Sequence, residues 1–274
     1  MNFVVQPVSA AQAAEAARLG GAASLEQAGA RAYRLRGGTA NPAVLAYAKA
    51  QRFDLAAVGE GLRFADLKLV AMDMDSTLIT IECIDEIGDL AGNKAAIAAI
   101  TARAMRGEID YANSLRQRVG LLAGLGTDAL QRVYDERLRL SPGAEALVAA
   151  CRKHGIKLLL VSGGFSFFTE RLKQRLGLDY TISNELEFAE GKLTGGLVGR
   201  IIDAEAKAAR FREVAHALGA TQDQTVAIGD GANDLKMMAE AGLSVAYRAK
   251  PLVKAQAHCA LEYSGLDAVI ALFE

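Results

Sequence analysis

The chain has 274 residues, of which 51% are hydrophobic and 23% are charged, a balance typical of a globular protein with a buried core. Its 31 basic and 32 acidic residues leave a formal charge of −1, and no basic stripe stands out, so a nucleic-acid partner is not expected. No apolar stretch approaches the roughly 20 residues that cross a bilayer, and the N-terminus lacks a signal-peptide pattern. Cys83, Cys151 and Cys259 are far apart, which favours reduced thiols over a disulfide framework or a zinc site. These features predict a cytoplasmic protein without membrane contact.

Residues 1–66 are rich in alanine and predict a small α+β module. Helical patterning covers Ala10–Leu19 and Pro42–Gln51, and the short apolar runs Asn2–Val5 and Arg31–Leu35 have the composition of strands. Nothing in this segment resembles a catalytic set, and a regulatory role is one interpretation of it.

From residue 67 the pattern changes to apolar runs separated by helical segments. Four runs predict strands buried on both faces of a parallel sheet: Leu67–Met72, Ile156–Val161, Thr225–Ile228 and Leu243–Ala246. Three segments between them predict helices: Gly143–His154, Phe167–Leu176 and Ala204–Leu218. Strand and helix in alternation indicate an α/β fold with a doubly wound, Rossmann-like sheet.

Two stretches interrupt this alternation. Ile84–Leu138 is helical in pattern throughout and looks like an inserted helical subdomain, whereas Leu186–Val198 has the alternation and the central Glu190-Gly191 turn of a β-hairpin. The chain is then expected to divide into a module of residues 1–66, a core of residues 67–83 and 139–274, and an insertion of residues 84–138.

Polar residues gather where the predicted strands end. They form three groups: Asp73 with Asp75, Ser162-Gly163-Gly164, and Asp230 with Asp234. Because ligands of open α/β sheets bind outside the carboxyl ends of the strands, these loops should converge on one crevice. Four carboxylates that close repel one another unless a cation lies among them, and oxygen ligands shared with a phosphate favour Mg²⁺.

This set of residue types suits phosphoryl transfer. A carboxylate such as Asp73 can be the nucleophile, and Asp75 is placed to serve as an acid first and a base later. The Ser162 hydroxyl, the Gly163 amide and Lys207 are candidates to meet the charge of the phosphoryl oxygens. Each piece also has an ordinary interpretation, since an isolated DxD or SGG is more often a turn and a lone helical lysine usually faces solvent. Their order and their placement at strand ends favour a site.

The motifs DMDSTL, VSGGF, the downstream Lys207 and GDGANDLKM resemble, in this order, those of the haloacid dehalogenase (HAD) superfamily of phosphatases, from about Leu67 to the C-terminus. The resemblance implies that Asp73 is the phosphorylated nucleophile and Asp75 the general acid/base. It also implies that Mg²⁺ is held by Asp73, Asp230 and the carbonyl of Asp75. Ser162, Gly163 and Lys207 would then bind the phosphoryl group, with Thr77 and Asp234 in supporting positions.

The insertion would act in this family as a cap over a small substrate. The segments STLITIECIDEIGDLAG and SLRQRVGLLAGL are similar to the phosphoserine phosphatases within it. That resemblance implies that Glu82 meets the substrate ammonium, Arg118 its carboxylate, and that Asn233 faces the substrate. Arg116, two positions away, competes with Arg118 for this role, and Glu82 also has the character of a residue that begins a helix.

Two departures from the family pattern bear on this expectation. Tyr111 stands where the family often has Phe, and residues 1–66 are shorter than a pair of amino-acid-sensing domains, so feedback regulation is not carried over. The expected function is hydrolysis of phosphoserine to serine and phosphate, the last step of serine biosynthesis. Three alternatives remain: a related small-molecule phosphatase of the superfamily, a phosphotransferase acting on a small alcohol such as homoserine, and a catalytically silent amino-acid sensor. The sequence leaves a monomer and a homodimer equally open.

Overall fold

The computed structural model describes residues 1–274 and contains two sheets, of four and seven strands. The smaller sheet belongs to the N-terminal segment, which runs through β1 (Asn2–Gln6), α1 (Ala10–Gly20), β2 (Ser24–Gly29), β3 (Ala32–Arg36), α2 (Pro42–Gln51) and β4 (Asp54–Val58). Its strands are antiparallel in the order β2-β3-β1-β4, the arrangement of a split βαβ or ferredoxin-like module. Both expected helices and both expected strands are confirmed, and β2 and β4 are additional.

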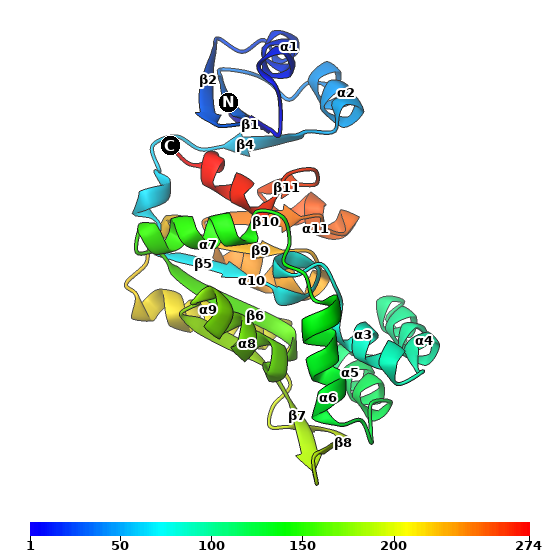
Figure 1. The fold of residues 1–274 in the computed structure, drawn as a ribbon. Coiled ribbons are helices and arrows are strands. Elements are labelled where there is room, and N and C mark those ends of the chain that lie inside the picture. The colour runs from blue at the N-terminus through cyan, green and yellow to red at the C-terminus, as the bar shows by residue number, and fades with distance from the viewer.

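The small sheet is covered on both faces. Phe3 and Val5 of β1 pack with α1 and α2, whereas Val4 points the other way and joins the main core. The helices begin where the sequence provides caps, because the Ser9 side chain accepts from the Gln12 amide and the Asn41 side chain accepts from two amides of α2. Figure 1 shows the module stacked on one end of the larger sheet, at the end opposite the helices of the insertion.

The larger sheet has the order β11-β10-β9-β5-β6-β7-β8 and is parallel except for the pair β7–β8. Its strands are β5 (Leu69–Met72), β6 (Lys157–Phe165), β7 (Tyr180–Ala189), β8 (Lys192–Val198), β9 (Thr225–Gly229), β10 (Leu243–Tyr247) and β11 (Cys259–Leu261). The helices around it are α7 (Ala144–Lys153), α8 (Ser166–Leu176), α9 (Ala204–Ala217), α10 (Leu235–Glu240) and α11 (Pro251–Gln256), followed by a 3₁₀ helix at Leu266–Leu272.

Alternate residues of the central strands enter two separate cores. Val70 and Met72 of β5 pack in the cluster that contains α7, whereas Leu69 and Ala71 pack with side chains of α9 and α10. A strand buried on both faces needs an apolar residue at every position, which is why the run reads LVAM. The doubly wound α/β core predicted from the sequence is confirmed.

Four helices precede α7 in the long connection between β5 and β6 and form the insertion: α3 (Cys83–Leu90), α4 (Lys94–Met105), α5 (Tyr111–Gly120) and α6 (Thr127–Arg132). They lie beside the β7–β8 hairpin at one end of the molecule (Figure 1). The hairpin turn is Glu190-Gly191, both with positive φ, as expected from the sequence. Two backbone hydrogen bonds join the insertion to the hairpin: the Gly124 amide donates to Leu193, and the Leu193 amide donates to Leu125, each at 2.8 Å. No helix combines the length and the apolar character needed to cross a membrane.

Candidate active site

The carboxyl ends of β5, β6 and β9 meet, as the strand-end motifs predict. Asp73 follows β5 directly, and its amide donates to Ile228 of the neighbouring β9. Lys207, from the first turn of α9, is fully buried and donates to Asp73 Oδ1 at 2.6 Å and to Asp234 Oδ1 at 2.8 Å. The ordinary interpretation of Lys207 as a solvated residue is therefore excluded.

Three carboxylates form a group that suits a divalent cation. One oxygen from each of Asp73, Asp230 and Asp234 lies within 4.8 Å of the others. Lys207 supplies a single positive charge to this group, so most of its negative charge has no protein partner. Hard oxygen donors in this number fit Mg²⁺. Asp234 makes the most hydrogen bonds within the protein of the three, since its Oδ2 also accepts from the Gly231 amide at 3.1 Å.

Burial and crowding shift the titration of these side chains. Burial raises the pKa of Asp73, and the neighbouring Asp234 raises it further while Lys207 opposes the rise. Burial likewise raises the pKa of Asp75 and of Asp230 to about 7. For Lys207, burial disfavours the charged form, but Asp234 and Asp73 outweigh it and raise the pKa, so the ammonium stays protonated. A cation among the carboxylates would counter the rise in their pKa values.

Asp75 is presented by a sharp turn that follows β5. Its φ and ψ of −66° and 134°, followed by 58° and 1° at Ser76, are those of a type II turn. The third residue of such a turn is usually Gly or Asn, so a serine there stores strain at the site. Asp75 Oδ1 accepts from the Cys83 amide at 2.8 Å, which ties the turn to the first residue of α3.

The segment Ser162-Gly163-Gly164 approaches Asp75 closely. A side-chain carbon at Gly164 would lie only 2.7 Å from Asp75 Oδ2, so a larger residue there would displace the Asp75 carboxylate. The buried Ser162 Oγ accepts from the Gly164 amide at 2.8 Å. The Gly163 carbonyl accepts from Tyr111 Oη of the insertion at 3.2 Å and from Asn184 Nδ2 of β7 at 2.8 Å.

Asn184 is a residue that the sequence analysis missed. It is buried, and besides its bond to Gly163 it accepts from the Ile202 amide at 2.8 Å. An asparagine inside the otherwise strand-like run YTISNELEF is the only signal of its position, and the register that brings it to Gly163 belongs to the folded sheet.

The predicted recognition residues occupy different surroundings. Glu82 stands at the N-cap of α3, as its helix-start character suggests, but its side chain caps nothing and instead accepts from Ser76 Oγ at 2.7 Å. Arg118 is partly buried, with Nε 3.4 Å from the Ser114 carbonyl, and its charge acts on Asp85 and Tyr111. Arg116 is exposed.

Asn233 and Thr77 lie at the edge of the carboxylate group. Asn233 is partly buried in the short turn that holds Asp234, and its side chain makes no hydrogen bond within the protein. The Thr77 hydroxyl is buried and lies 3.5 Å from Asp230 Oδ1. The structure thus brings together Asp73, Asp75, Asp230, Asp234, Lys207, Ser162 and Thr77, with Glu82, Tyr111 and Arg118 around them.

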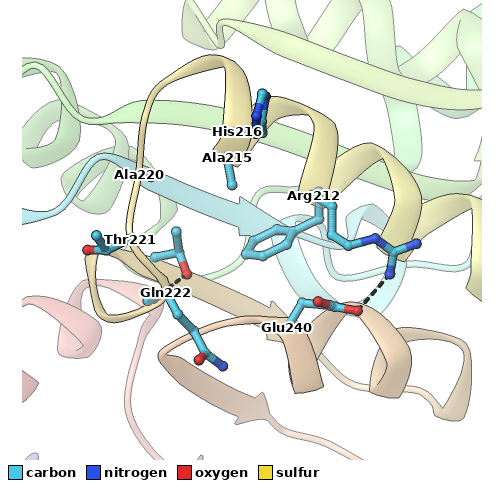
Figure 2. A pocket seen from close by; sticks show the side chains of 9 residues that line it. Arg212, Ala215, His216, Ala220, Thr221, Gln222 and Glu240 are labelled. Atoms are coloured by element: carbon cyan, nitrogen blue, oxygen red, sulfur yellow. Dashed lines mark hydrogen bonds and ion pairs between the residues drawn. The ribbon is translucent and has the colours of Figure 1, made fainter.

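A hollow of about 240 Å³ lies elsewhere, and it is shown in Figure 2. It lies where α9 and the following loop meet the amino end of β9, and the ion pair between Arg212 and Glu240 spans its side. The carboxylates lie at the carboxyl end of β9, whereas this hollow lies at its amino end. The hollow therefore takes no part in the site.

Comparison with known proteins identifies the family to which this chain belongs. Residues 70–239 match the model of the haloacid dehalogenase-like hydrolases. The chain belongs to the haloacid dehalogenase-like hydrolase family. The resemblance seen in the four motifs is confirmed.

Relatives in this family include proteins named for one substrate. A phosphoserine phosphatase of Polaromonas sp. (strain JS666) is 56% identical over 216 residues, covering 77% of this chain and 92% of that protein. The unliganded crystal structure of a probable phosphoserine phosphatase from Vibrio cholerae has a TM-score of 0.86 at 38% identity, covering 99% of this chain and 85% of that one. A phospho-aspartyl intermediate analogue of a phosphoserine phosphatase has a TM-score of 0.71 at 36% identity, covering 76% and 99%.

Proposed function

We propose that this HAD hydrolase is a Mg²⁺-dependent phosphoserine phosphatase that converts O-phospho-L-serine to L-serine and phosphate in the cytoplasm. The observation that carries the chemistry is the buried Asp73 carboxylate, hydrogen-bonded to Lys207 at 2.6 Å, with Asp75 two residues away. The substrate is supported by the names of the relatives and by two oppositely charged residues, Glu82 just before the insertion and Arg118 within it.

The first step transfers the phosphoryl group to the protein. The free Asp73 carboxylate oxygen attacks phosphorus, and the bond from phosphorus to the serine oxygen breaks. Protonated Asp75 gives its proton to the leaving alkoxide, which departs as serine. Lys207, the Ser162 hydroxyl and the Gly163 amide meet the charge that develops on the phosphoryl oxygens.

The second step returns Asp73 to its free form. Asp75, now a carboxylate, takes a proton from water as that water attacks phosphorus, and the bond from phosphorus to Asp73 breaks to release phosphate. Mg²⁺ held by Asp73, Asp230 and the Asp75 carbonyl would supply positive charge for the phosphoryl oxygens. The Lys207 hydrogen bonds keep Asp73 in one orientation through both steps.

Recognition of the amino acid falls mainly to the insertion and to Glu82 just before it. A phosphoserine bound with its phosphorus at Asp73 presents one ammonium and one carboxylate, and a closed site must pair both charges. Glu82, beside the Asp75 turn, is assigned to the ammonium, and Arg118 on α5 to the carboxylate. Asn233, whose side chain is free of protein partners, is assigned a further polar contact with the substrate.

A panel of phosphorylated metabolites tests this function. With Mg²⁺, purified protein should release phosphate from phosphoserine far faster than from a sugar phosphate or a nucleotide, and EDTA should abolish release. Equal rates on all substrates would reject phosphoserine as the specific substrate but leave the phosphatase activity assigned. Turnover that survives EDTA would reject the dependence on Mg²⁺.

Asp73→Asn separates an enzyme from a silent sensor. The amide cannot attack phosphorus, so turnover should fall by about 10³-fold or more, while calorimetry should still detect phosphoserine binding. Persistent turnover in this variant would exclude Asp73 as the nucleophile.

A further inference from the structure

A second cavity, of about 430 Å³, lies at the junction between the N-terminal module and the core, outside the site described above. It is lined by Arg52, from the C-terminal end of α2, and by Arg248, Glu262 and Tyr263 of the core. One wall therefore comes from the module and the others from the loops that follow β10 and β11.

Both arginines line this cavity and are exposed, and the Arg248 guanidinium also lies over the Tyr247 ring, 5.3 Å from its centroid. Neither Arg52 nor Arg248 makes a side-chain hydrogen bond or an ion pair, and the carboxylate of Glu262 is bound to Lys254 instead. Arg52 lies over the Tyr263 ring, 5.6 Å from its centroid. Two cations without an anionic protein partner line one hollow, so an anion that binds there can pair with both.

The backbone holds the two arginines in an unusual conformation. Their φ values are 57° for Arg52 and 46° for Arg248, in the left-handed region that side chains other than those of Gly and Asn rarely adopt. The opposite wall is rigid, because the buried Asp54 carboxylate accepts from the amides of Glu262, Tyr263 and Ser264 at 2.8 to 3.2 Å. The backbone that carries the lining residues is therefore held in place on both sides of the cavity.

We propose that this cavity binds a small anion with at least two charged oxygens, carboxylate or phosphate, between Arg52 and Arg248. Guanidinium groups bind such oxygens in pairs, and the Tyr263 ring offers a flat surface beside them. The module supplies one of the two cations, which gives residues 1–66 a role that the reaction itself does not require.

The loop that carries Arg248 also reaches the reaction site. Two residues after Arg248, the Lys250 amide donates to the Asp230 carbonyl at 3.1 Å. A ligand that moves Arg248 would act through this short segment on Asp230, one of the three carboxylates that suit a divalent cation. This coupling rests on the proposed function, whereas the binding of the anion does not.

Calorimetry on the full chain tests the binding, with succinate and inorganic phosphate as separate probes at constant ionic strength. We expect Arg52→Gln and Arg248→Gln each to weaken binding of at least one probe by about tenfold or more, and Arg52→Lys to restore part of it. Arg31→Gln, which removes an exposed arginine of the same module, is the matched control and should bind as the wild type does. Phosphate is also expected to bind at the reaction site. In the phosphate titration the wild type should therefore show two binding events, and the arginine variants should lose only the one at the cavity.

The result that overturns the proposal is that no probe binds saturably, or that both arginine variants bind like the wild type while circular dichroism shows them folded. Coupling is tested by the succinate dependence of kcat/KM for phosphoserine, expected to change about fivefold or more in the wild type and not in either variant. Variant-sensitive binding with unchanged kinetics would reject the coupling. Absence of any phosphatase activity would instead reject the proposed function, and calorimetry would still decide the anion site.

Discussion

Arg116 and Arg118 stand two positions apart on α5, yet the fold gives them different surroundings. Arg118 is partly buried near Asp85 and Tyr111, whereas Arg116 faces solvent. Arg118→Gln should lower kcat/KM for phosphoserine about 10- to 100-fold, mainly through KM. The reason is that it removes the proposed charge-assisted hydrogen bond to the carboxylate of phosphoserine. The loss should be much smaller on p-nitrophenyl phosphate, which lacks that group.

Arg116→Gln is the matched control for this change, since it removes the same charge from the same helix. Steady-state kinetics on both substrates should leave it close to the wild type. If Arg118→Gln harms the two substrates alike, Arg118 does not recognise the amino acid.

Tyr111 joins the insertion to the segment Ser162-Gly163-Gly164 by one hydroxyl. Its Oη donates to the Gly163 carbonyl at 3.2 Å, a bond that the phenylalanine frequent in the family would lack. Tyr111→Phe should lower kcat/KM about 2- to 10-fold, the effect of one hydrogen bond, because α5 and Gly163 are then held together less firmly. Asn184 still binds the same carbonyl and limits the loss.

Tyr134→Phe is a suitable comparison, because Tyr134 is also half-buried in the insertion and its hydroxyl makes no hydrogen bond. Kinetics and thermal melting of both variants would separate the bond from the general effect of losing a hydroxyl. Identical behaviour of the two variants would argue against a role for the Tyr111–Gly163 bond.

At the scale of elements, the β7–β8 hairpin packs against the insertion through a glycine. Gly195 has a φ of 86°, and an added side-chain carbon would lie 3.2 Å from Ala123 Cβ and 3.2 Å from the backbone of Gly120. Gly191 in the same hairpin has a φ of 76° but open space around it. A side chain at either position would strain the backbone, and only at Gly195 would it also be crowded.

Gly191→Ala should therefore cost about 1–2 kcal/mol of folding free energy from strain alone. Gly195→Ala should cost at least about 1 kcal/mol more, because the backbone of α5 cannot move aside without separating the insertion from the hairpin. Denaturant unfolding measures both changes, and equal losses would show that the contact with α5 yields easily. We also expect a lower kcat/KM for Gly195→Ala only.

Elements whose burial leaves a pattern in the sequence were predictable. The runs of β5, β6, β9 and β10 are apolar at successive positions because both faces are covered, and the Glu190-Gly191 turn identifies its hairpin directly. β2 has the sequence SLEQAG and is almost wholly exposed, so no apolar alternation marks it. β11 has only three residues, too few for any periodicity.

The candidate site divides in the same way. Asp73, Ser162 and Asp230 follow predicted strands, so their convergence follows from the topology of a parallel sheet. Asn184 and the hydroxyl of Tyr111 reach Gly163 through tertiary packing, which no local pattern encodes. The resemblance assigned Arg118, but Arg116 remained a competitor, because a spacing of two along a helix does not say which side faces the core.

At the scale of the whole molecule, Asp54 fastens the module to the core. Its carboxylate is buried and accepts from three successive amides, residues 262–264, just after β11. Asp54→Ala would leave those amides without partners, so we expect a loss of about 2–4 kcal/mol in unfolding free energy and faster proteolysis between module and core. Asp54→Asn keeps one acceptor oxygen and should lose less.

Denaturant unfolding and limited proteolysis of the pair test this graded effect. If Asp54→Ala unfolds and resists cleavage as the wild type does, other contacts hold the module in place. This docking could not be read from the sequence, since Asp54 is separated from its partners by about 200 residues.

The two sheets also leave few strand edges open to another molecule. The outer strand β8 is bound to the insertion through Leu193, and β11 at the other end lies against β4 of the module. That leaves β2, whose register with β3 shifts between Gln27 and Gly29. A bulge twists an edge strand away from the flat geometry that a further strand needs. We therefore expect the folded chain to resist edge-to-edge aggregation, and the small sheet to end at β2.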